Sequence, residues 1–271
     1  MSEVKLDETQ KQTLRDAMLA AGRVILAVRA DGGDHTIKGD GSPVTLADTR
    51  AEVILLKALK DVVPKIPVVA EEAAEAGNIP KTAGAFFLVD PLDGTKEFIR
   101  GGTDFTVNIG LIENGVPVFG QIYVPATGRF YEGEAGQGAW AVDIDCGENT
   151  TFPNIGKKTI SVRTADPQNL MAVASRSHRS DETNAWLKAH NVKDTVSAGS
   201  SLKFCLLAEG QADVYPRHGP TMEWDTAAGH AILSAAGGRV ENLGGSVFLY
   251  GKADQDRPYL NPGFIAYGAK A

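Results

Sequence analysis

Two aspartates, Asp90 and Asp93, stand in the segment Val89–Glu97, which reads Val-Asp-Pro-Leu-Asp-Gly-Thr-Lys-Glu. The residues directly before Asp90 form a continuous apolar run, Ala-Phe-Phe-Leu-Val, which is typical of a buried strand. We therefore expect Asp90 where that strand ends, and a turn at Pro91, whose ring fixes φ, that brings the two carboxylates together. Carboxylates this close repel each other unless a cation lies between them, and hard oxygen ligands suit Mg²⁺ or Mn²⁺. The alternative is an ordinary turn, since Asp, Pro and Gly are all turn formers.

Three further acids stand at the ends of expected elements. Glu71 follows the apolar segment 66–70, Asp225 lies at the expected start of a helix, and Asp48 lies in the first turn of another. Each has a simpler interpretation. Acidic side chains in a first helical turn commonly interact favourably with the helix macrodipole. Glu71 with Glu72 is also compatible with a solvated acidic pair. The flanking residues described below favour a common role over these separate interpretations.

The hydrophobic pattern predicts the elements that position these acids. In the first half it indicates two helices, a short strand, the strand before Asp90, a hairpin around Asn114-Gly115 and two more strands, over residues 7–29, 45–63, 66–70, 85–89, 104–111, 116–123, 129–131 and 138–142. In the second half strands and helices alternate, over residues 171–174, 181–190, 202–209, 212–215 and 226–236. A polar, turn-rich stretch at 143–158 separates them, so we divide the chain into an N-terminal α+β half, 1–158, and a C-terminal α/β half, 159–271.

Composition excludes several classes of protein. The chain has 271 residues, a formal net charge of −7 and a sequence pI near 5.3, which argues against a sequence-independent nucleic-acid binder. Cys146 and Cys205 have no zinc-site spacing and indicate a reduced compartment. No apolar run approaches the roughly 18 residues of a membrane-spanning helix, and the polar N-terminus is unlike a signal peptide. We expect a cytoplasmic protein with no integral membrane span, and leave open peripheral attachment at the inner face of the cell membrane and the oligomeric state.

Three blocks of the sequence resemble the signature of the inositol monophosphatase superfamily. They are the acidic pair Glu71-Glu72, the segment Asp90-Pro91-Leu92-Asp93-Gly94-Thr95 and the segment Trp224-Asp225-Thr226-Ala227-Ala228-Gly229, which occur in the family's order over almost the whole chain. Details outside these blocks are similar to the CysQ-type branch, the 3'(2'),5'-bisphosphate nucleotidases. Those details are Lys96-Glu97-Phe98-Ile99, the segment Tyr215–Thr221 and the segment Leu260–Phe264. Inositol monophosphatases usually carry Thr-Asn-Phe after the Asp-Gly-Thr.

The resemblance implies a fold and a set of roles. The fold would be a layered α/β/α/β/α sandwich with the site between the halves. Members are Mg²⁺-dependent, lithium-sensitive phosphomonoesterases with two or three metal ions, which Mn²⁺ can replace. By this resemblance Glu71, Asp90, Asp93, Asp225 and the Leu92 carbonyl would bind metal, with Glu71 also counted as catalytic. Thr95 would orient the attacking water, and Asp48 would accept a hydrogen bond from the Thr95 hydroxyl. Gly94 would let the backbone approach the phosphate closely, and the amides of Gly94 and Thr95 would donate hydrogen bonds to its oxygens.

Substrate recognition is expected mainly from the second half. Ser200 and Lys203 lie near the start of a helix, and His178 follows a strand, positions suited to a second phosphate and a ribose. Arg176 and Arg217 are weaker candidates. The alternatives are that Ser200 or Ser201 is an ordinary N-cap, that Lys203 is an exposed helix residue, and that the Tyr-Pro-Arg segment is only a turn. Leu92, Asp93, Gly94, Thr95 and Asp225 would complete the substrate site.

Three functions fit these observations to different degrees. The leading one is hydrolysis of adenosine 3',5'-bisphosphate to AMP and phosphate, with the phosphosulfate analogue PAPS as a second substrate and Li⁺ as an inhibitor. The second is the same chemistry on an inositol or another small sugar or polyol phosphate. The third is a catalytically silent protein that binds nucleotide and metal, which the presence of every acid named above disfavours. His230 and Cys205 are expected to be packed helix residues, not ligands or nucleophiles.

Overall fold

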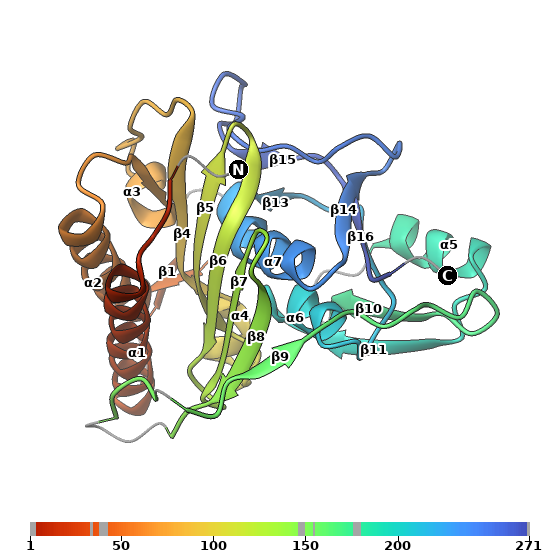
Figure 1. Cartoon of the computed structure of the whole chain (residues 1–271), viewed down its shortest axis with the longest axis horizontal. Helices are drawn as coiled ribbons and strands as arrows, with labels where there is room; N and C mark the ends of the chain where they lie inside the picture. The colour runs from red at the N-terminus through yellow and green to blue at the C-terminus, as the bar shows by residue number, and fades with distance from the viewer. Residues whose placement is uncertain are drawn as a thin grey trace.

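The computed structural model describes residues 4–32, 35–37, 43–145, 150–153, 155–175 and 180–269. Two sheets alternate with three helical layers (Figure 1). The order is a pair of N-terminal helices, a seven-stranded sheet, a central pair of helices, a five-stranded sheet and one outer helix. The layered α/β/α/β/α sandwich expected from the sequence is therefore confirmed.

The first layer consists of α1 (Glu8–Ala30) and α2 (Leu46–Val62), which pack against each other. Helix α1 begins with the predicted capping box, in which Asp7 Oδ1 accepts from the Gln10 N–H at 2.8 Å and the Gln10 side chain accepts from the Asp7 N–H. Before α2, a short ribbon is formed by β1 (His35–Ile37) and β2 (Pro43–Thr45). Both helices begin within about one residue of the predicted position.

The seven-stranded sheet has the order β3-β4-β5-β6-β7-β8-β9. Its strands are antiparallel except for the parallel pair β3–β4. The bounds are β3 (Val68–Ala70), β4 (Ala85–Asp93), β5 (Thr106–Glu113), β6 (Val116–Val124), β7 (Arg129–Glu134), β8 (Gly138–Asp143) and β9 (Lys158–Ile160). Strand β9 pairs with β8 and spans residue 158, so the proposed boundary between the two halves falls inside this sheet.

Alternate residues of β4 enter different cores, as expected for a strand buried on both faces. Phe87 and Val89 pack with the side chains of α1 and α2. Phe86 and Leu88 pack in the core that contains Trp224 of α7 (Glu223–Ala235). Helix α7 lies close against the sheet because small residues line the contact: a Cβ at Gly120 would stand 2.4 Å from the backbone oxygen of Ala228.

The C-terminal layers complete the molecule. The five-stranded sheet has the order β11-β10-β12-β16-β14, and helix α5 lies on its outer side (Figure 1). Helix α6 (Leu202–Ala208) packs beside α7 between the two sheets. The bounds of the remaining elements are α3 (Glu71–Glu75), α4 (Thr95–Ile99), β10 (Met171–Ser175), α5 (Asp181–Ala189), β11 (Asp194–Ala198), β12 (Val214–Arg217), β13 (Thr221–Met222), β14 (Arg239–Asn242), β15 (Leu260–Asn261) and β16 (Phe264–Tyr267).

One expected boundary is wrong at the functional centre. The strand that was expected to end at Val89 continues through Pro91 to Asp93. It continues because β5 pairs with it on both sides of an irregularity: Asp90 lies opposite Asn108 and Asp93 opposite Thr106, with a register shift between them. Pro91 is tolerated at this irregularity, since a bulge leaves residues outside the regular ladder. Helix α7 also begins earlier than expected, so Asp225 lies inside its first turn.

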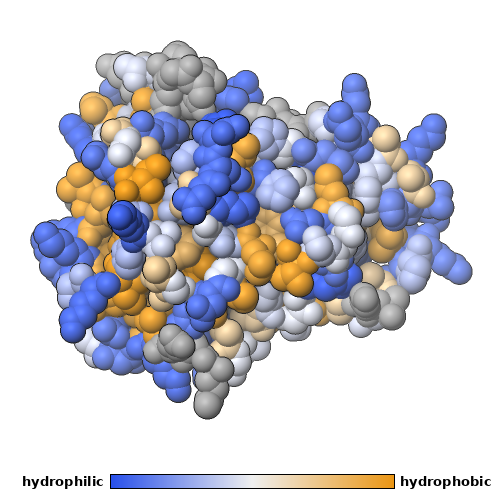
Figure 2. Space-filling view, turned by 90° about the horizontal axis from the view of Figure 1, so that it is seen from above, coloured by the Kyte–Doolittle hydropathy of each residue, from blue (hydrophilic) through white to orange (hydrophobic). Residues whose placement is uncertain are grey.

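The surface mixes hydrophilic and hydrophobic residues. On the face seen in Figure 2, hydrophobic groups are interspersed among charged and polar ones. None of the helices in the described ranges has the length and apolarity needed to cross a membrane.

Candidate active site

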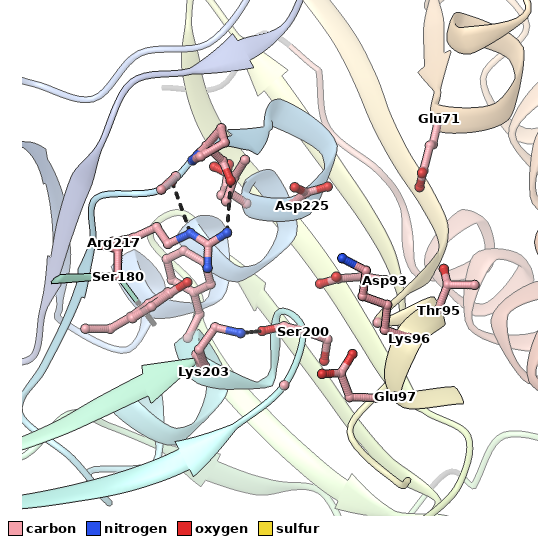
Figure 3. Close-up of a pocket in the computed structure, with 18 residues that line it drawn as sticks. Glu71, Asp93, Thr95, Lys96, Glu97, Ser180, Ser200, Lys203, Arg217 and Asp225 are labelled. Carbon is pink, nitrogen blue, oxygen red and sulfur yellow. Dashed lines mark hydrogen bonds between the residues drawn. The ribbon is translucent and has the colours of Figure 1, made fainter. Parts of the chain in front are cut away.

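A cavity of about 460 Å³ opens between the two halves of the chain. Its walls come from α3, from β4 and α4, from α6 and from the segment between β12 and α7 (Figure 3). Glu71, Asp93, Thr95 and Asp225 lie at one side, while Lys203, Arg217 and Ser180 lie at the other. Carboxylates thus prevail at one end, although Lys96 also lines it, and the cations Lys203 and Arg217 lie at the other; we call these the acidic end and the basic end.

Asp90 lies behind the acidic end and is only 1% exposed. Its Oδ1 accepts from the Leu92 N–H at 2.9 Å, which stabilises the irregular part of β4. Burial, together with the nearby carboxylates of Glu71, Asp93 and Asp225, raises the pKa of Asp90 well above its usual value. Glu71, Asp93 and Asp225 thus lie close enough to Asp90 to act on its charge, and the backbone that places Asp90 and Asp93 is an irregular strand and not a simple turn.

Asp93 and Asp225 are brought together by a serine between them. The Ser201 hydroxyl lies 2.9 Å from Asp93 Oδ2 and 2.7 Å from the Asp225 backbone oxygen. Asp225 Oδ2 accepts from the Met222 N–H at 2.8 Å and so caps α7. Burial and the neighbouring Asp93 raise the pKa of Asp225 to about 7. Asp225 therefore combines the simple capping role with a place in the acidic cluster.

Asp48 likewise has two roles, one for each carboxylate oxygen. Oδ2 accepts from the Thr45 N–H and the Thr45 hydroxyl, both at 2.7 Å, and so caps α2. Oδ1 accepts from the Thr95 hydroxyl at 3.2 Å. Thr95 Oγ1 also lies 3.1 Å from the Leu92 carbonyl oxygen. The pairing of Asp48 with Thr95 that the resemblance implied is thus present in the structure.

Gly94 is required by the backbone between β4 and α4. Its φ of 93° lies in the left-handed region, which side chains other than that of Gly adopt reluctantly. A Cβ there would stand 2.7 Å from the Asp104 backbone oxygen. Helix α4 begins at the next residue, Thr95. The left-handed φ and the tight packing therefore require glycine at this position, whether or not a ligand binds.

The basic end contains a buried lysine. Lys203 is 5% exposed, and its Nζ donates to the Ser200 carbonyl oxygen at 2.5 Å. Burial lowers its pKa to about 8, while Asp93 acts in the opposite direction. Arg217 donates from Nε to the Gly219 oxygen at 3.1 Å and from Nη2 to the Pro220 oxygen at 2.9 Å. The expectation that Lys203 is an ordinary exposed helix residue is excluded.

Ser200 and Ser201 do not act as ordinary N-caps. Ser201 occupies the N-cap position of α6, but its side chain makes no capping hydrogen bond and instead contacts Asp93. Ser200 has a φ of 46°, and its hydroxyl oxygen is buried without a protein partner in the described residues. A buried hydroxyl of this kind needs a hydrogen-bonding partner, which water or a ligand can supply.

The chemistry of the acidic end suits a hard cation. Within the described ranges no three His, Cys, Asp or Glu side chains already converge as a complete metal-binding group. The carboxylates of Glu71, Asp93 and Asp225 nevertheless share one cavity wall, and all of these donors are oxygens, which Mg²⁺ prefers. Lys203 and Arg217 offset the charges of Asp93 and Asp225 only in part, because the pKa values of both carboxyls, like that of Asp90, remain raised. A divalent cation would compensate these charges.

Some candidates were missed and others lie outside the described residues. Sequence reasoning gave no site role to Ser180 and named Ser201 only as a possible N-cap. It named the buried Glu97 and the wall residues Tyr215 and Thr221 only as parts of segments that resemble the CysQ-type branch. The signal for Ser201 was the Ser-Ser doublet, which gave no indication of which serine reaches Asp93. His178, Arg176 and Cys146 lie outside the described residues.

Two other residues were correctly expected to be packed. Cys205 is fully buried in α6. His230 is buried in α7, with Nδ1 3.1 Å from the Tyr250 hydroxyl, and burial lowers its pKa to about 3. Neither lines the cavity described above.

Comparison with known proteins gives relatives that match nearly the whole chain. The model of the inositol monophosphatase family matches residues 6–268. The 3'(2'),5'-bisphosphate nucleotidase CysQ of Salmonella typhimurium is 45% identical over 247 residues, which are 90% of this chain and 94% of that protein. The protein of the same name from Escherichia coli O157:H7 is 43% identical, with the same coverage of 90% and 94%.

Solved structures agree with the sequence relatives. CysQ from Bacteroides thetaiotaomicron, a bacterial member of the inositol monophosphatase family, superposes with a TM-score of 0.76 at 37% identity, covering 97% of this chain and 99% of that one. An inositol monophosphatase from Anabaena shares the fold, with a TM-score of 0.71 at 24% identity and coverage of 96% and 90%. The chain therefore belongs to the inositol monophosphatase family and, within it, groups with the bacterial CysQ proteins.

Proposed function

We propose that this protein is a Mg²⁺-dependent phosphomonoesterase that hydrolyses adenosine 3',5'-bisphosphate to AMP and phosphate, with PAPS as a second substrate. One observation carries the proposal: a single cavity has a carboxylate cluster at one end and a buried lysine with an arginine at the other. A substrate with two separate phosphates fits such a cavity. The relatives named 3'(2'),5'-bisphosphate nucleotidase support the same substrate class.

We assign the metal-binding role to Glu71, Asp90, Asp93, Asp225 and the Leu92 carbonyl, for two or three Mg²⁺ ions that Mn²⁺ can replace. When bound, the metal supplies Lewis-acid stabilisation of the charge that develops on the phosphate. The protein contributes a cluster held by three separate anchors. These are the bulged strand β4, the Ser201 hydroxyl and the capped first turn of α7.

Thr95 and Asp48 are assigned to the attacking water. The Thr95 hydroxyl donates to Asp48 Oδ1, which leaves the lone pairs of Thr95 Oγ1 to accept a hydrogen from water. A water held in this way presents its own lone pair to the phosphorus atom. Asp48 is fixed by its hydrogen bonds to Thr45, so it can hold the threonine hydroxyl in one orientation and favour removal of the proton from water.

The basic end is assigned to the phosphate that is retained. Lys203, Ser200 and Arg217 would bind the 5'-phosphate, together with His178, which follows β10 in the sequence and lies outside the described residues. Hydrogen bonds from a cation to phosphate are about twice as strong as neutral ones. Gly94 and Thr95 would contact the phosphate that is cleaved, through their backbone amides. Li⁺ is expected to inhibit, by competing at the carboxylate cluster.

A comparison of three substrates tests the proposal. Phosphate release from adenosine 3',5'-bisphosphate, PAPS and inositol 1-phosphate is measured with Mg²⁺ and after chelation with EDTA. We expect the highest kcat/KM on the adenosine bisphosphate, slower hydrolysis of PAPS, and no release without metal. Faster turnover of inositol 1-phosphate would assign the alternative function, a phosphatase of small polyol phosphates. No turnover of any of the three would favour a catalytically silent protein.

A further inference from the structure

Helix α3 carries Glu71 as its first residue but has no capping side chain of its own. The N-cap residue is Ala70, which makes no side-chain cap hydrogen bond. The first N–H groups of a helix have no partner within the helix and usually bind a Ser, Thr, Asp or Asn at the N-cap. In α3 these groups must be satisfied by another part of the chain.

Glu52, from helix α2, supplies the missing cap. Its Oε2 accepts from the Glu72 N–H at 2.8 Å, and its Oε1 accepts from the Ala73 N–H at 3.0 Å. The Glu52 side chain is 6% exposed. A buried carboxylate is unfavourable unless it is hydrogen-bonded, and two N–H groups at the positive end of a helix satisfy that need. Glu52 therefore fixes where α3 begins, and with it the backbone position of Glu71.

The same face of α2 also reaches Thr95. Asp48 precedes Glu52 by four residues, so the two side chains lie one above the other on the helix. Asp48 accepts from the Thr95 hydroxyl, while Glu52 holds the start of α3. One turn of α2 thus carries two anchoring carboxylates. Asp48 contacts Thr95, which we assign to the attacking water. Glu52 holds the start of α3, where Glu71, which we assign to metal binding, is the first residue. In Figure 3, Glu71 and Thr95 lie along the same side of the cavity.

We propose that Glu52 is a positioning residue that holds Glu71 at the metal site through the N-terminus of α3. The inference rests on the metal-binding role proposed above for Glu71. Without the two hydrogen bonds, the first turn of α3 has no cap, and the Glu71 carboxylate loses its defined distance from Asp90 and Asp93. Groups that orient metal ligands typically change metal affinity by about 10- to 100-fold when they are replaced.

The test measures Mn²⁺ binding directly, by the loss of the free-ion electron paramagnetic resonance signal on titration of the full chain without substrate. We expect Glu52→Gln to raise the Mn²⁺ dissociation constant about tenfold, because an amide offers one acceptor oxygen where the carboxylate offered two. The matched control is Glu132→Gln. Glu132 is also buried, 4% exposed, but it pairs with Arg15 of α1, away from α3. We expect the control to leave the dissociation constant unchanged.

A double-mutant cycle separates positioning from a general effect on the fold. In a Glu71→Ala background, which itself weakens Mn²⁺ binding, Glu52→Gln is expected to add nothing. An equal loss in both backgrounds would overturn the inference, since Glu52 would then act independently of Glu71. Circular dichroism confirms folding of each variant. If Glu52→Gln does not fold, Glu52→Asp, too short to reach both N–H groups, replaces it in the same cycle.

The outcomes also distinguish this inference from the proposed function. Normal Mn²⁺ affinity in Glu52→Gln, together with weakened affinity in Glu71→Ala, would overturn the positioning role and leave the metal site standing. Normal affinity in Glu71→Ala would overturn both.

Discussion

Two groups of buried charges lie against the seven-stranded sheet, and they differ in whether the charges are compensated. In the first, Arg15 of α1 donates from Nε and Nη2 to the two carboxylate oxygens of Glu132, at 2.8 and 2.7 Å. Gln121 adds a hydrogen bond to Glu132 at 2.8 Å. In the second, Asp90 lies among other carboxylates. The charges of the first group are paired within the protein, whereas Lys203 and Arg217 offset those of the second group only in part.

The directions of the pKa shifts express this difference. Although burial disfavours the Arg15 charge, its hydrogen bonds to Glu132 and Glu8 raise its pKa and so favour the charged form. Burial raises the pKa of Asp90, and the carboxylates of Glu71, Asp93 and Asp225 raise it further. The charges of a buried ion pair stabilise each other without any ligand. The charges of a buried cluster of carboxylates repel each other, and such clusters are common at sites that bind a cation or carry out catalysis. This difference supports the metal-binding role proposed for the second group.

The largest effect should come from changing the uncompensated group. We expect Asp93→Asn to lower Mg²⁺-dependent phosphate release about a thousandfold, since it removes a charge that we assign to metal binding and transition-state stabilisation. The metal-free protein should remain folded, because the change removes repulsion. Steady-state kinetics and urea unfolding of the metal-free variant check both parts. Asp61→Asn, at a site 58% exposed on α2, is the control and should match wild type. Retained activity in Asp93→Asn would contradict the ligand assignment.

A change in the ion pair of Arg15 and Glu132 should lower stability and leave activity nearly unchanged. Arg15→Met leaves Glu132 buried without its cation, which typically lowers the free energy of unfolding by about 3–5 kcal/mol. The kcat of the folded fraction should stay close to that of wild type, because Arg15 lies away from the cavity. Urea unfolding and an assay at low temperature measure the two quantities. A large loss of kcat with little loss of stability would reverse the distinction between the groups.

A smaller effect should appear in the pH dependence of the metal-free protein. The pKa of Asp225 in the folded state, about 7, lies above the value near 4 expected for an unfolded chain. Protonation of Asp225 therefore stabilises the fold. This contribution is complete below about pH 4 and is lost as the pH rises through 7. A shift of about three pKa units corresponds to roughly 4 kcal/mol in all, of which roughly 2.5 kcal/mol is lost between pH 5 and pH 8.

The variant Asp225→Asn isolates this contribution. Between pH 5 and pH 8, the free energy of unfolding of wild type should fall relative to that of Asp225→Asn. His230 destabilises both proteins equally in acid, since its folded-state pKa of about 3 lies below the unfolded value. Saturating Mg²⁺ should stabilise wild type at pH 8. A difference that is independent of pH would show that Asp225 is not part of the uncompensated cluster.

The smallest predicted effect concerns the basic end of the cavity. Lys203→Met should raise the KM for adenosine 3',5'-bisphosphate about tenfold, as expected for the loss of one charge-assisted hydrogen bond. Hydrolysis of adenosine 3'-phosphate, which lacks the second phosphate, should be nearly unchanged. In wild type, the KM for the bisphosphate should increase as the pH rises past about 8, where the free Lys203 loses its proton. An equal effect of Lys203→Met on both substrates would mean that the lysine does not bind the 5'-phosphate.

Local signals in the sequence were sufficient for the five longer helices, whereas the layered arrangement was implied by the resemblance to the family. Asp7 with Gln10 marks the start of α1, and the apolar spacing after it gives the length of the helix. Asp48 and Asp225 were identified at helix starts, and each indeed caps its helix while joining the cavity. Such features depend on residues a few positions apart, which is why they can be read from the chain.

Features that depend on distant residues could not be predicted. Strand β4 continues past Pro91 only because Thr106 and Asn108 of β5 pair with its far end. Ser201 meets Asp93 across 108 positions of the sequence, and Glu52 reaches the N–H of Glu72 from 20 positions away. Each depends on how complete elements pack. Two of them left partial signals: Ser201 belongs to the Ser-Ser doublet, and Glu52 stands one helical turn after Asp48.

The identity of the phosphate that leaves distinguishes the two ends of the cavity most directly. Hydrolysis of adenosine 3',5'-bisphosphate by the wild-type protein with Mg²⁺ is followed by ³¹P nuclear magnetic resonance, which distinguishes the two possible nucleotide products. If the carboxylate cluster cleaves one phosphate while Lys203 and Arg217 hold the other, the products are adenosine 5'-monophosphate and inorganic phosphate, and EDTA stops their formation. Formation of adenosine 3'-monophosphate, or phosphate release that persists in EDTA, would contradict the account.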